Sequence, residues 1–348
     1  MKKIYLLFFI LLFSCLSVQA QLTDVVTGLS NPSRLLLNGN DLYFSTNSEI
    51  FKIDITQSSP TPVSVVNGAN GVVGMAIGGN TLYFSEFGAG RISKIDITAT
   101  SPTIEVVLGG LNTPASLLLA GNTMYYSDPN DDIVSKFDVT DPSPTPILVA
   151  NSNINFNPSG LALQGNILYM GQGIANRVSK VDVTGGVTQP TDVVVGVNRP
   201  LGIRLKGNNL IIAEYIGNKI SIKDLTNSAN TAVDLVTGVN SPTDIEIAGN
   251  TLFILEKGAN KISKIDIALG LNEETLQNDI ALYPNPAHNF IQVSSTSSSM
   301  SYSIYTISGS KIASGMMEPN ENISVQGLSA GVYLFKSQDN AAIRFVKE

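Results

Sequence analysis

The sequence of 348 residues contains one cysteine, one histidine and no tryptophan. A disulfide framework, a Cys/His zinc site and any mechanism that needs two histidines are therefore excluded. Charged residues make up only 14% of the chain, and the net charge is −7. A chain with this charge is not expected to bind nucleic acid. After the first 20 residues no apolar run approaches the roughly 20 residues of a membrane-spanning helix, so no membrane span is expected.

The first 20 residues have the pattern of a secretory signal peptide. Lys2 and Lys3 precede an apolar run from Ile4 to Phe13, and small residues occupy the −3 and −1 positions, Val18 and Ala20. This pattern predicts export and cleavage before Gln21. Cys15 leaves a second hypothesis open, because the residues before it partly match a lipoprotein processing site and a lipid there would tether the protein.

Internal repetition dominates the chain before residue 268. A Gly-Asn pair recurs with steps of 40, 42, 44, 42 and 42 residues. The pairs begin at Gly39, Gly79, Gly121, Gly165, Gly207 and Gly249. A second marker, an aspartate that ends a β-rich run, keeps the same phase. It falls at Asp54, Asp96, Asp138, Asp182, Asp224 and Asp266. Two markers in phase six times indicate six structural repeats.

Each repeat has four short β-rich runs separated by turn residues, and helical periodicity is absent. Four strands in about 42 residues are typical of a β-propeller blade. The Gly-Asn pairs predict tight hairpins between the first two strands, because glycine supplies a positive φ. We predict an all-β chain with a six-bladed β-propeller over residues 21–267. An additional strand at 23–28 is expected to complete the sixth blade, whose own third strand is 261–267. An open solenoid would leave both end strands unpaired.

Residues 82–96, from Leu82 to Asp96, resemble the NHL and YWTD repeats of six-bladed propellers. An aromatic strand, an acidic residue and a basic-plus-isoleucine strand follow one another in the same order. The resemblance covers roughly residues 22 to 267 and extends to SMP-30-like propellers. It implies the architecture and says little about chemistry, because such propellers include binding platforms, receptors, lactonases and lyases.

The tail differs from the repeats. We predict a linker over residues 268–279 and a small immunoglobulin-like β-sandwich over residues 280–348. The segments 283–286, 304–309 and 328–333 and the terminal Lys347-Glu348 resemble the type A sorting domain of the Bacteroidetes type IX secretion system. The resemblance implies that the type IX machinery is a partner, and that the protein crosses the outer membrane. The tail would then be removed, with release or attachment at the cell surface. An adhesion domain is the alternative.

The propeller lacks the common catalytic groups. The only histidine is His288, in the tail, so no Ser-His-Asp or Cys-His arrangement can form in the repeats. Residues 128–132 begin like a calcium loop, but Ile133 and Val139 occupy positions 6 and 12, where an EF-hand needs glycine and glutamate. We interpret this segment as a blade turn.

One polar position recurs at the end of the second strand of each repeat. Its residues are Thr46, Glu86, Asp128, Gln172, Glu214 and Glu256. The loops that lead into the innermost strands are rich in asparagine and share a face with these residues.

Two interpretations of this recurring polar position are open. Carboxylate and amide oxygens suit calcium or a cationic ligand, and SMP-30-like lactonases, as the resemblance implies, hold a metal in this channel. Glu86, Asp128, Glu214 and Glu256 are then the candidate ligands. Alternatively, each side chain accepts backbone N–H bonds in its own turn.

Residues that break the repeat are the better ligand-binding candidates, because structural features recur in every blade and binding sites do not. Arg34, Arg204 and Asp244 lie near the start of innermost strands, and Asn155 and Phe156 lie in the longest lead-in loop. Ordinary variation between blades is the competing explanation.

From these features we expect a secreted or cell-surface propeller that is not an enzyme and has no cofactor other than possible calcium. It would act as a monomer on an unknown extracellular ligand or protein. The alternative is a calcium-dependent hydrolase like SMP-30 or gluconolactonase. A surface adhesin without a discrete ligand is a third hypothesis.

Overall fold

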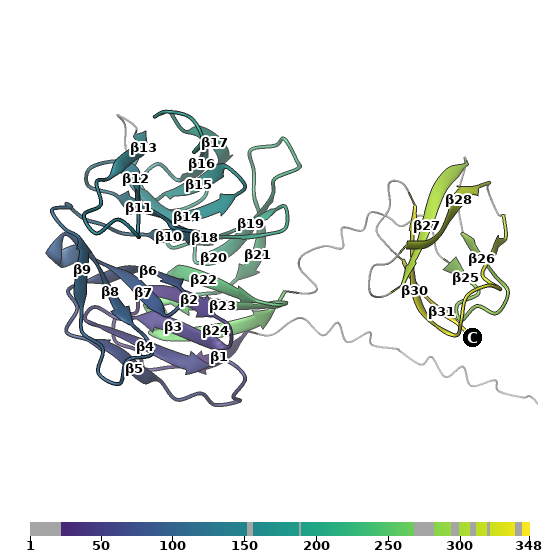
Figure 1. The fold of residues 1–348 in the computed structure, drawn as a ribbon, viewed down its shortest axis with the longest axis horizontal. Coiled ribbons are helices and arrows are strands. Elements are labelled where there is room, and N and C mark those ends of the chain that lie inside the picture. Colours follow the sequence, from purple (N-terminus) through teal and green to yellow (C-terminus); the bar gives the residue numbers. More distant parts are fainter. Residues whose placement is uncertain are drawn as a thin grey trace, which may run out of the picture. The chain divides into compact units, whose positions relative to one another are not determined.

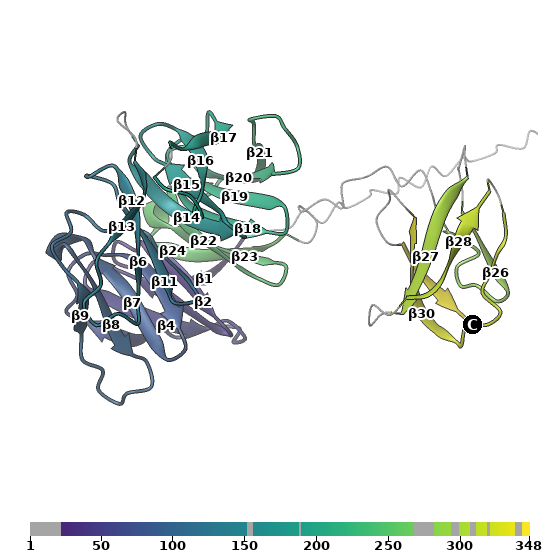
Figure 2. The same ribbon diagram turned by 45° about the horizontal axis from the view of Figure 1, so that its top comes forward.

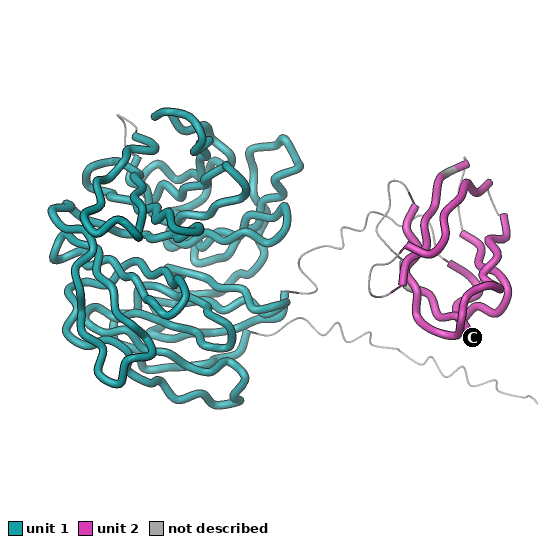
Figure 3. Tube along the Cα trace, in the orientation of Figure 1, with its two compact units in different colours: residues 1–267 teal, residues 268–348 magenta. Residues whose placement is uncertain are grey.

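The structure is a computed structural model that describes residues 22–151, 156–187, 189–267, 282–293, 299–306, 311–318, 321–337 and 343–348. The chain divides into two compact units, residues 1–267 and 268–348 (Figure 3). The predicted signal peptide and the predicted linker lie outside the described residues.

The described part of the first unit forms six four-stranded antiparallel sheets (Figures 1 and 2). Each sheet is one blade, in which the strands follow one another from the innermost to the outermost. The first blade contains β2 (Arg34–Asn38), β3 (Asp41–Ser45), β4 (Glu49–Asp54) and β5 (Val63–Asn67). The second contains β6 (Val72–Gly78), β7 (Thr81–Glu86), β8 (Arg91–Asp96) and β9 (Glu105–Leu108). The third contains β10 (Leu117–Ala120), β11 (Thr123–Asp128), β12 (Ile133–Asp138) and β13 (Ile147–Asn151).

The other three blades repeat the same order. The fourth blade contains β14 (Pro158–Gln164), β15 (Ile167–Gln172), β16 (Arg177–Asp182) and β17 (Thr191–Val195). The fifth contains β18 (Pro200–Lys206), β19 (Asn209–Glu214), β20 (Lys219–Asp224) and β21 (Val233–Thr237). The sixth contains β22 (Pro242–Ala248), β23 (Thr251–Glu256), β24 (Lys261–Asp266) and β1 (Thr23–Val26). Two single-turn 3₁₀ helices, η1 (Phe87–Ala89) and η2 (Lys257–Ala259), follow β7 and β23.

The innermost strands form a closed ring. They contact one another in the order β2, β6, β10, β14, β18, β22 and back to β2. The N-terminal strand β1 is hydrogen-bonded to β24, so the two ends of the repeat array share the sixth blade. Closure removes the exposed strand edges that an open array would have.

The Gly-Asn pairs occupy the hairpins between first and second strands. All six glycines have φ between 56° and 60°, in the left-handed region where a side chain is strained. The repeated spacing thus sets the position of every hairpin, and with it the register of the two inner strands.

The cores of the propeller lie between neighbouring blades. Tyr43 of the first blade packs with Met75 and Leu82 of the second, and Tyr125 of the third packs with Leu161 of the fourth. The tyrosines that recur at this position, Tyr43, Tyr83, Tyr125 and Tyr169, are all buried core residues.

The second unit contains two sheets in its described residues. One has the order β25 (Leu282–Tyr283), β26 (Phe290–Val293) and β29 (Ile323–Ser324), and the other has the order β28 (Lys311–Met317), β27 (Met300–Thr306), β30 (Gly331–Ser337) and β31 (Ile343–Lys347). Both sheets contribute to one buried cluster, with Ile291 from the first and Ile304, Phe335 and Phe345 from the second. The immunoglobulin-like topology of this unit stays a prediction. No helix in the described ranges has the length and apolar character of a membrane span.

Candidate functional site

The recurring polar residues at the ends of the second strands are buried, and we call them the strand-end residues. They are Glu86, Asp128, Gln172, Glu214 and Glu256, with exposed fractions of 0–2%. The first blade has Thr46 at this position, in a shorter turn where its backbone N–H donates to the Glu49 carbonyl.

Glu86 shows how a strand-end residue is held. Its Oε2 accepts a 3.0 Å hydrogen bond from the backbone N–H of Asn70, in the lead-in loop of the same blade. Its Oε1 accepts from Arg91 Nε at 2.7 Å and from Ser93 Oγ at 2.5 Å, both on the third strand. Burial alone would raise the pKa of this carboxyl, but the hydrogen bonds from Arg91, Ser93 and Asn70 lower it below its ordinary value.

The other strand-end residues repeat this pattern. Glu214 and Glu256 also accept from an asparagine backbone N–H 16 residues earlier and from a serine hydroxyl seven residues later. Asp128 accepts from the backbone of Asn112 and Thr113 instead. Gln172 donates to Ser179 and accepts from Arg177. For the three glutamates these bonds join the lead-in loop to the third strand, so they connect three segments of a blade rather than one turn. The bonds of Asp128 go to the lead-in loop, and those of Gln172 go to the third strand.

The innermost strands enclose a cavity in the central channel, and the strand-end residues do not line it. Among the described residues, no three His, Cys, Asp or Glu side chains are grouped closely enough to hold a metal ion. In the segment 128–132, Asp131 accepts from Asn112 Nδ2, and Asp132 accepts from the backbone N–H of Asn157 in the next blade. Asn176 and Asn218 make the same contact between blades, which identifies the segment as a blade turn.

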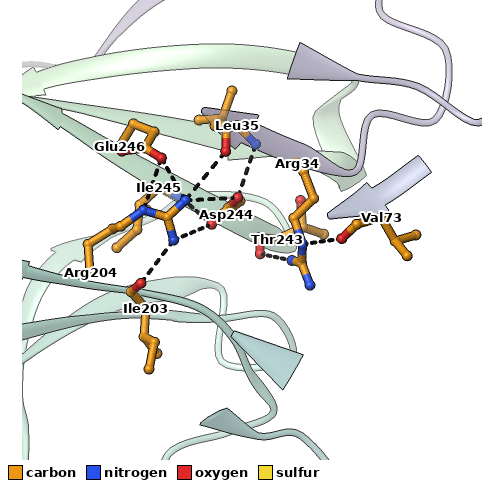
Figure 4. Close-up of polar contacts among 9 residues, drawn as sticks. All are labelled: Arg34, Leu35, Val73, Ile203, Arg204, Thr243, Asp244, Ile245 and Glu246. Atoms are coloured by element: carbon orange, nitrogen blue, oxygen red, sulfur yellow. Dashed lines mark hydrogen bonds and ion pairs between the residues drawn. The ribbon is translucent and has the colours of Figure 1, made fainter. Parts of the chain in front are cut away.

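The central channel holds a cavity of about 330 Å³ between the innermost strands. Three of the candidates from the sequence, Arg34, Arg204 and Asp244, lie together in its wall (Figure 4). They come from the first, fifth and sixth blades, which are neighbours in the ring. Glu246 completes the group and was missed in the sequence.

Arg204 pairs with the two carboxylates of β22, Asp244 and Glu246. Its Nη2 lies 2.6 Å from Glu246 Oε1, and its Nη1 lies 3.3 Å from Asp244 Oδ1. Burial would lower the pKa of Arg204, but the charges of Asp244 and Glu246 raise it overall. Asp244 also accepts from the backbone N–H groups of Leu35 and Ile245. The carboxylate of Asp244 is therefore fully engaged by groups of three blades.

Arg34 is held differently, by two backbone carbonyls. Its Nε donates to the Val73 carbonyl at 2.6 Å, and its Nη1 donates to the Thr243 carbonyl at 3.2 Å. These carbonyls belong to the second and sixth blades, so the side chain connects the two neighbours of its own blade (Figure 4). Burial lowers the pKa of Arg34, and the more distant charge of Asp244 opposes this effect.

The opposite side of the channel is built from small residues. Gly74, Ser116 and Gly160 occupy the repeat position that Arg34 and Asp244 hold in their blades. A Cβ atom on Gly74 would lie 1.9 Å from the Ala115 carbonyl oxygen, and one on Gly160 would lie 2.3 Å from that of Leu201. Glycine is required there because the neighbouring strand approaches so closely. The charged side chains of the channel therefore all come from one half of the ring, and the other half contributes only small and aliphatic residues.

The remaining candidates lie elsewhere. Asn155 is outside the described residues. Phe156 is fully buried and packs with Leu161 and Met170 in the core between the third and fourth blades. Its assignment as a site residue is wrong, because a ring inside the core cannot meet a ligand.

The motifs of the tail come together in the second unit. The backbone N–H of Val346 donates to Asn285 Oδ1 at 2.9 Å, and Ala287 exchanges backbone hydrogen bonds with Val346 and Glu348. The C-terminus thus lies against the segment 283–287 that carries the proline motif.

Comparison with known proteins identifies the tail and the propeller fold. Residues 281–347 match the family model of the secretion system C-terminal sorting domain. No curated protein matches the chain. A solved nidogen/laminin complex contains a similar chain, with 13% identity, a TM-score of 0.59, and coverage of 66% of this chain and 90% of that one.

Two further solved structures are similar. A putative gluconolactonase has 13% identity and a TM-score of 0.56, with 72% of this chain and 92% of that chain covered. Virginiamycin B lyase from Staphylococcus aureus has 17% identity and a TM-score of 0.54, with 79% and 95% covered. Such low identities establish the fold alone. The chain is thus a β-propeller followed by a type IX secretion sorting domain, which directs the protein to the cell surface or the extracellular space.

Proposed function

We propose that the propeller is an extracellular binding protein that takes its ligand, or one group of a larger partner, into the central channel. The observation that carries this proposal is the asymmetry of the channel wall. Three neighbouring blades supply Arg34, Arg204, Asp244 and Glu246, while the other blades supply small and aliphatic side chains around the same cavity. A purely structural ring would repeat the same residues in each blade.

The charged half of the channel is suited to recognition. Arg204 is fixed by Glu246 and Asp244, and Arg34 is fixed by carbonyls on both sides. Polar groups that are already held in place lose little conformational entropy when a ligand binds. Export to the cell surface or beyond places the channel in contact with extracellular molecules.

Several features favour binding over catalysis. The only histidine of the chain is in the tail. Both oxygens of Asp244 and one oxygen of Glu246 are engaged by Arg204 or by backbone N–H groups. The alternative, a calcium-dependent lactonase, needs the strand-end carboxylates as metal ligands. Those carboxylates already accept hydrogen bonds inside their blades.

The test is the thermal midpoint of the purified chain from Gln21 onward, measured with separate classes of small molecules. The panel holds carboxylates, amines, neutral sugars, lactones and calcium. A ligand at about 100 times its Kd adds roughly 2.7 kcal/mol to the free energy of unfolding, which is easily detected. We expect at least one organic class to raise the midpoint without being converted.

The channel is tested with Ser116→Leu, which fills the cavity from the small side. Ser101→Leu, on an exposed turn, is the matched control. Binding that survives Ser116→Leu, or no binding by any class, contradicts a channel site. Lactone turnover that stops on chelation supports the hydrolase instead.

A further inference from the structure

We infer that Arg34 is a carboxylate receptor and that the channel binds a short aliphatic monocarboxylate through this guanidinium. The inference rests on the proposed function and assigns the chemical class of the ligand.

Arg34 has unused donors that face the cavity. A guanidinium carries five N–H groups. In the described part of the chain, Nε uses its one N–H on Val73, and Nη1 uses one of two on Thr243. Nη2 has no hydrogen-bond partner among the described residues, and Figure 4 draws no contact to it. The Nε N–H is taken by Val73, which leaves the Nη1–Nη2 edge as the side of the fork that can bind both oxygens of a carboxylate.

The charge of Arg34 also lacks a direct counter-ion. Within the described ranges no carboxylate forms an ion pair with it. Asp244, whose charge acts on Arg34, is engaged by Arg204, Leu35 and Ile245. Arg34 is partly buried, so its guanidinium has lost part of its hydration, and an anion that binds to it regains part of the lost interaction.

Lys257 lies close enough to Arg34 and Arg199 for the charges of both to act on it. Arg34 begins the innermost strand β2, Arg199 lies in the lead-in loop of the fifth blade, and Lys257 lies in η2 after the second strand of the sixth. Burial, followed by repulsion from Arg34 and Arg199, lowers the pKa of Lys257. The three cations therefore share one region, which attracts anions.

The rest of the cavity selects among anions. Asp244 and Glu246 line the same cavity and repel a dianion more strongly than a monoanion. The wall also includes the aliphatic side chains of Ala76, Leu118 and Ala162, from the second, third and fourth blades. A volume of about 330 Å³ is at the lower end of ligand pockets, which span roughly 300–1,000 Å³. These features together fit a carboxylate with a few aliphatic carbons.

The experiment is calorimetric titration of the purified chain from Gln21 onward with sodium butyrate, acetate, succinate and inorganic phosphate, at constant ionic strength. We expect butyrate to bind more tightly than acetate, and both to bind more tightly than succinate or phosphate. Preference for phosphate or succinate, or no binding of butyrate, overturns the inference.

Two variants locate the site. Arg34→Gln should weaken butyrate binding by about tenfold or more, because it removes a charge-assisted bidentate contact. Lys180→Gln removes the same charge from an exposed position on the fourth blade and should have no effect. Ser116→Leu leaves Arg34 and both of its carbonyl partners in place and should also abolish binding. Undiminished butyrate binding in either cavity variant overturns the inference.

The two proposals fail separately. If butyrate does not bind but another class in the panel gives a rise that Ser116→Leu abolishes, the carboxylate assignment is wrong and the channel is still a binding site. If no class binds, the proposed function fails as well.

Discussion

Arg204 and Glu246 hold equivalent positions in neighbouring blades, 42 residues apart, and their side chains meet at 2.6 Å in the channel. At the same repeat position the other blades have Leu36, Ala76, Leu118 and Ala162. An ion pair thus replaces an apolar contact at one junction of the ring. The substitution concentrates charge on one side of the channel without adding net charge there.

Removing one member of this pair should be costly. Arg204→Leu leaves Asp244 and Glu246 near one another without their cation, and we expect it to lower the free energy of unfolding by about 3–5 kcal/mol. Urea denaturation at pH 7 measures this. A loss of less than about 1 kcal/mol in the free energy of unfolding would contradict this, because it would mean that water solvates the two carboxylates almost as well as Arg204 does.

The double variant Arg204→Leu/Glu246→Leu is the control. Leucine is the native residue at this position in two other blades. The double variant should therefore be more stable than Arg204→Leu alone, because buried ion pairs can be replaced by packed apolar groups. If it is less stable, the charge of Glu246 is favourable even without Arg204.

The strand-end residues should behave as structural hydrogen-bond acceptors. Glu86→Ala removes a fully buried acceptor that serves Asn70, Arg91 and Ser93. We expect a loss of about 3 kcal/mol or more in the free energy of unfolding. Glu86→Gln should cost only about 1 kcal/mol, because Gln172 fills this position in the fourth blade. Glu105→Ala, on an exposed strand, should change stability by less than about 0.5 kcal/mol.

Repeated Asp-x-Thr turns should make the propeller sensitive to acid. In five blades the aspartate accepts from the backbone N–H and the hydroxyl of the threonine two residues later. These hydrogen bonds lower the aspartate pKa values below 3.8. A carboxyl with a lowered folded-state pKa stabilises the fold above its unfolded-state pKa. This stabilisation is lost as the pH falls through the folded-state pKa.

A threonine variant tests this origin of the shift. Thr98→Val removes the hydroxyl donor to Asp96, so the Asp96 pKa should rise toward its ordinary value while the Asp138 pKa stays unchanged. Carboxyl ¹³C chemical shifts followed from pH 6 to pH 2 measure both groups. An unchanged Asp96 pKa would assign the shift to the backbone N–H alone.

The sequence predicts the propeller because its constraints are local and repeated. A left-handed glycine at each hairpin and one aspartate at each third-strand end recur in phase. The hydrogen bonds of the strand-end residues were harder to predict from the sequence than the strands and hairpins. Their donor Asn70 precedes Glu86 by 16 residues, and Asn112, Asn198 and Asn240 keep the same offset from their partners. That spacing was a usable signal for a hydrogen bond between loop and strand.

The channel site was only partly predictable. Arg34, Arg204 and Asp244 were found because they depart from the repeat, and Glu246 departs from it in the same way, so the same signal would have found it. Phe156 was chosen for the length of its loop, and only the packing between blades shows that it belongs to the core. Which donors of Arg34 remain free depends on two backbone carbonyls of neighbouring blades, whose direction no sequence pattern specifies.

Closure of the ring by β1 gives the last prediction. Val26 pairs with Ile262 and is 9% exposed, and Val66 pairs with Ile50 at the corresponding place in the first blade. Asp24 adds an ion pair of 2.6 Å with Lys261.

We expect Val26→Asp and Val66→Asp each to lower the free energy of unfolding by about 3 kcal/mol or more, because each buries a carboxylate that has no partner. Thermal unfolding compares the two variants with the parent chain. If Val26→Asp unfolds like the parent while Val66→Asp does not, β1 can detach without loss of the fold. Equal losses mean that the N-terminal strand is as integral to the sixth blade as β5 is to the first.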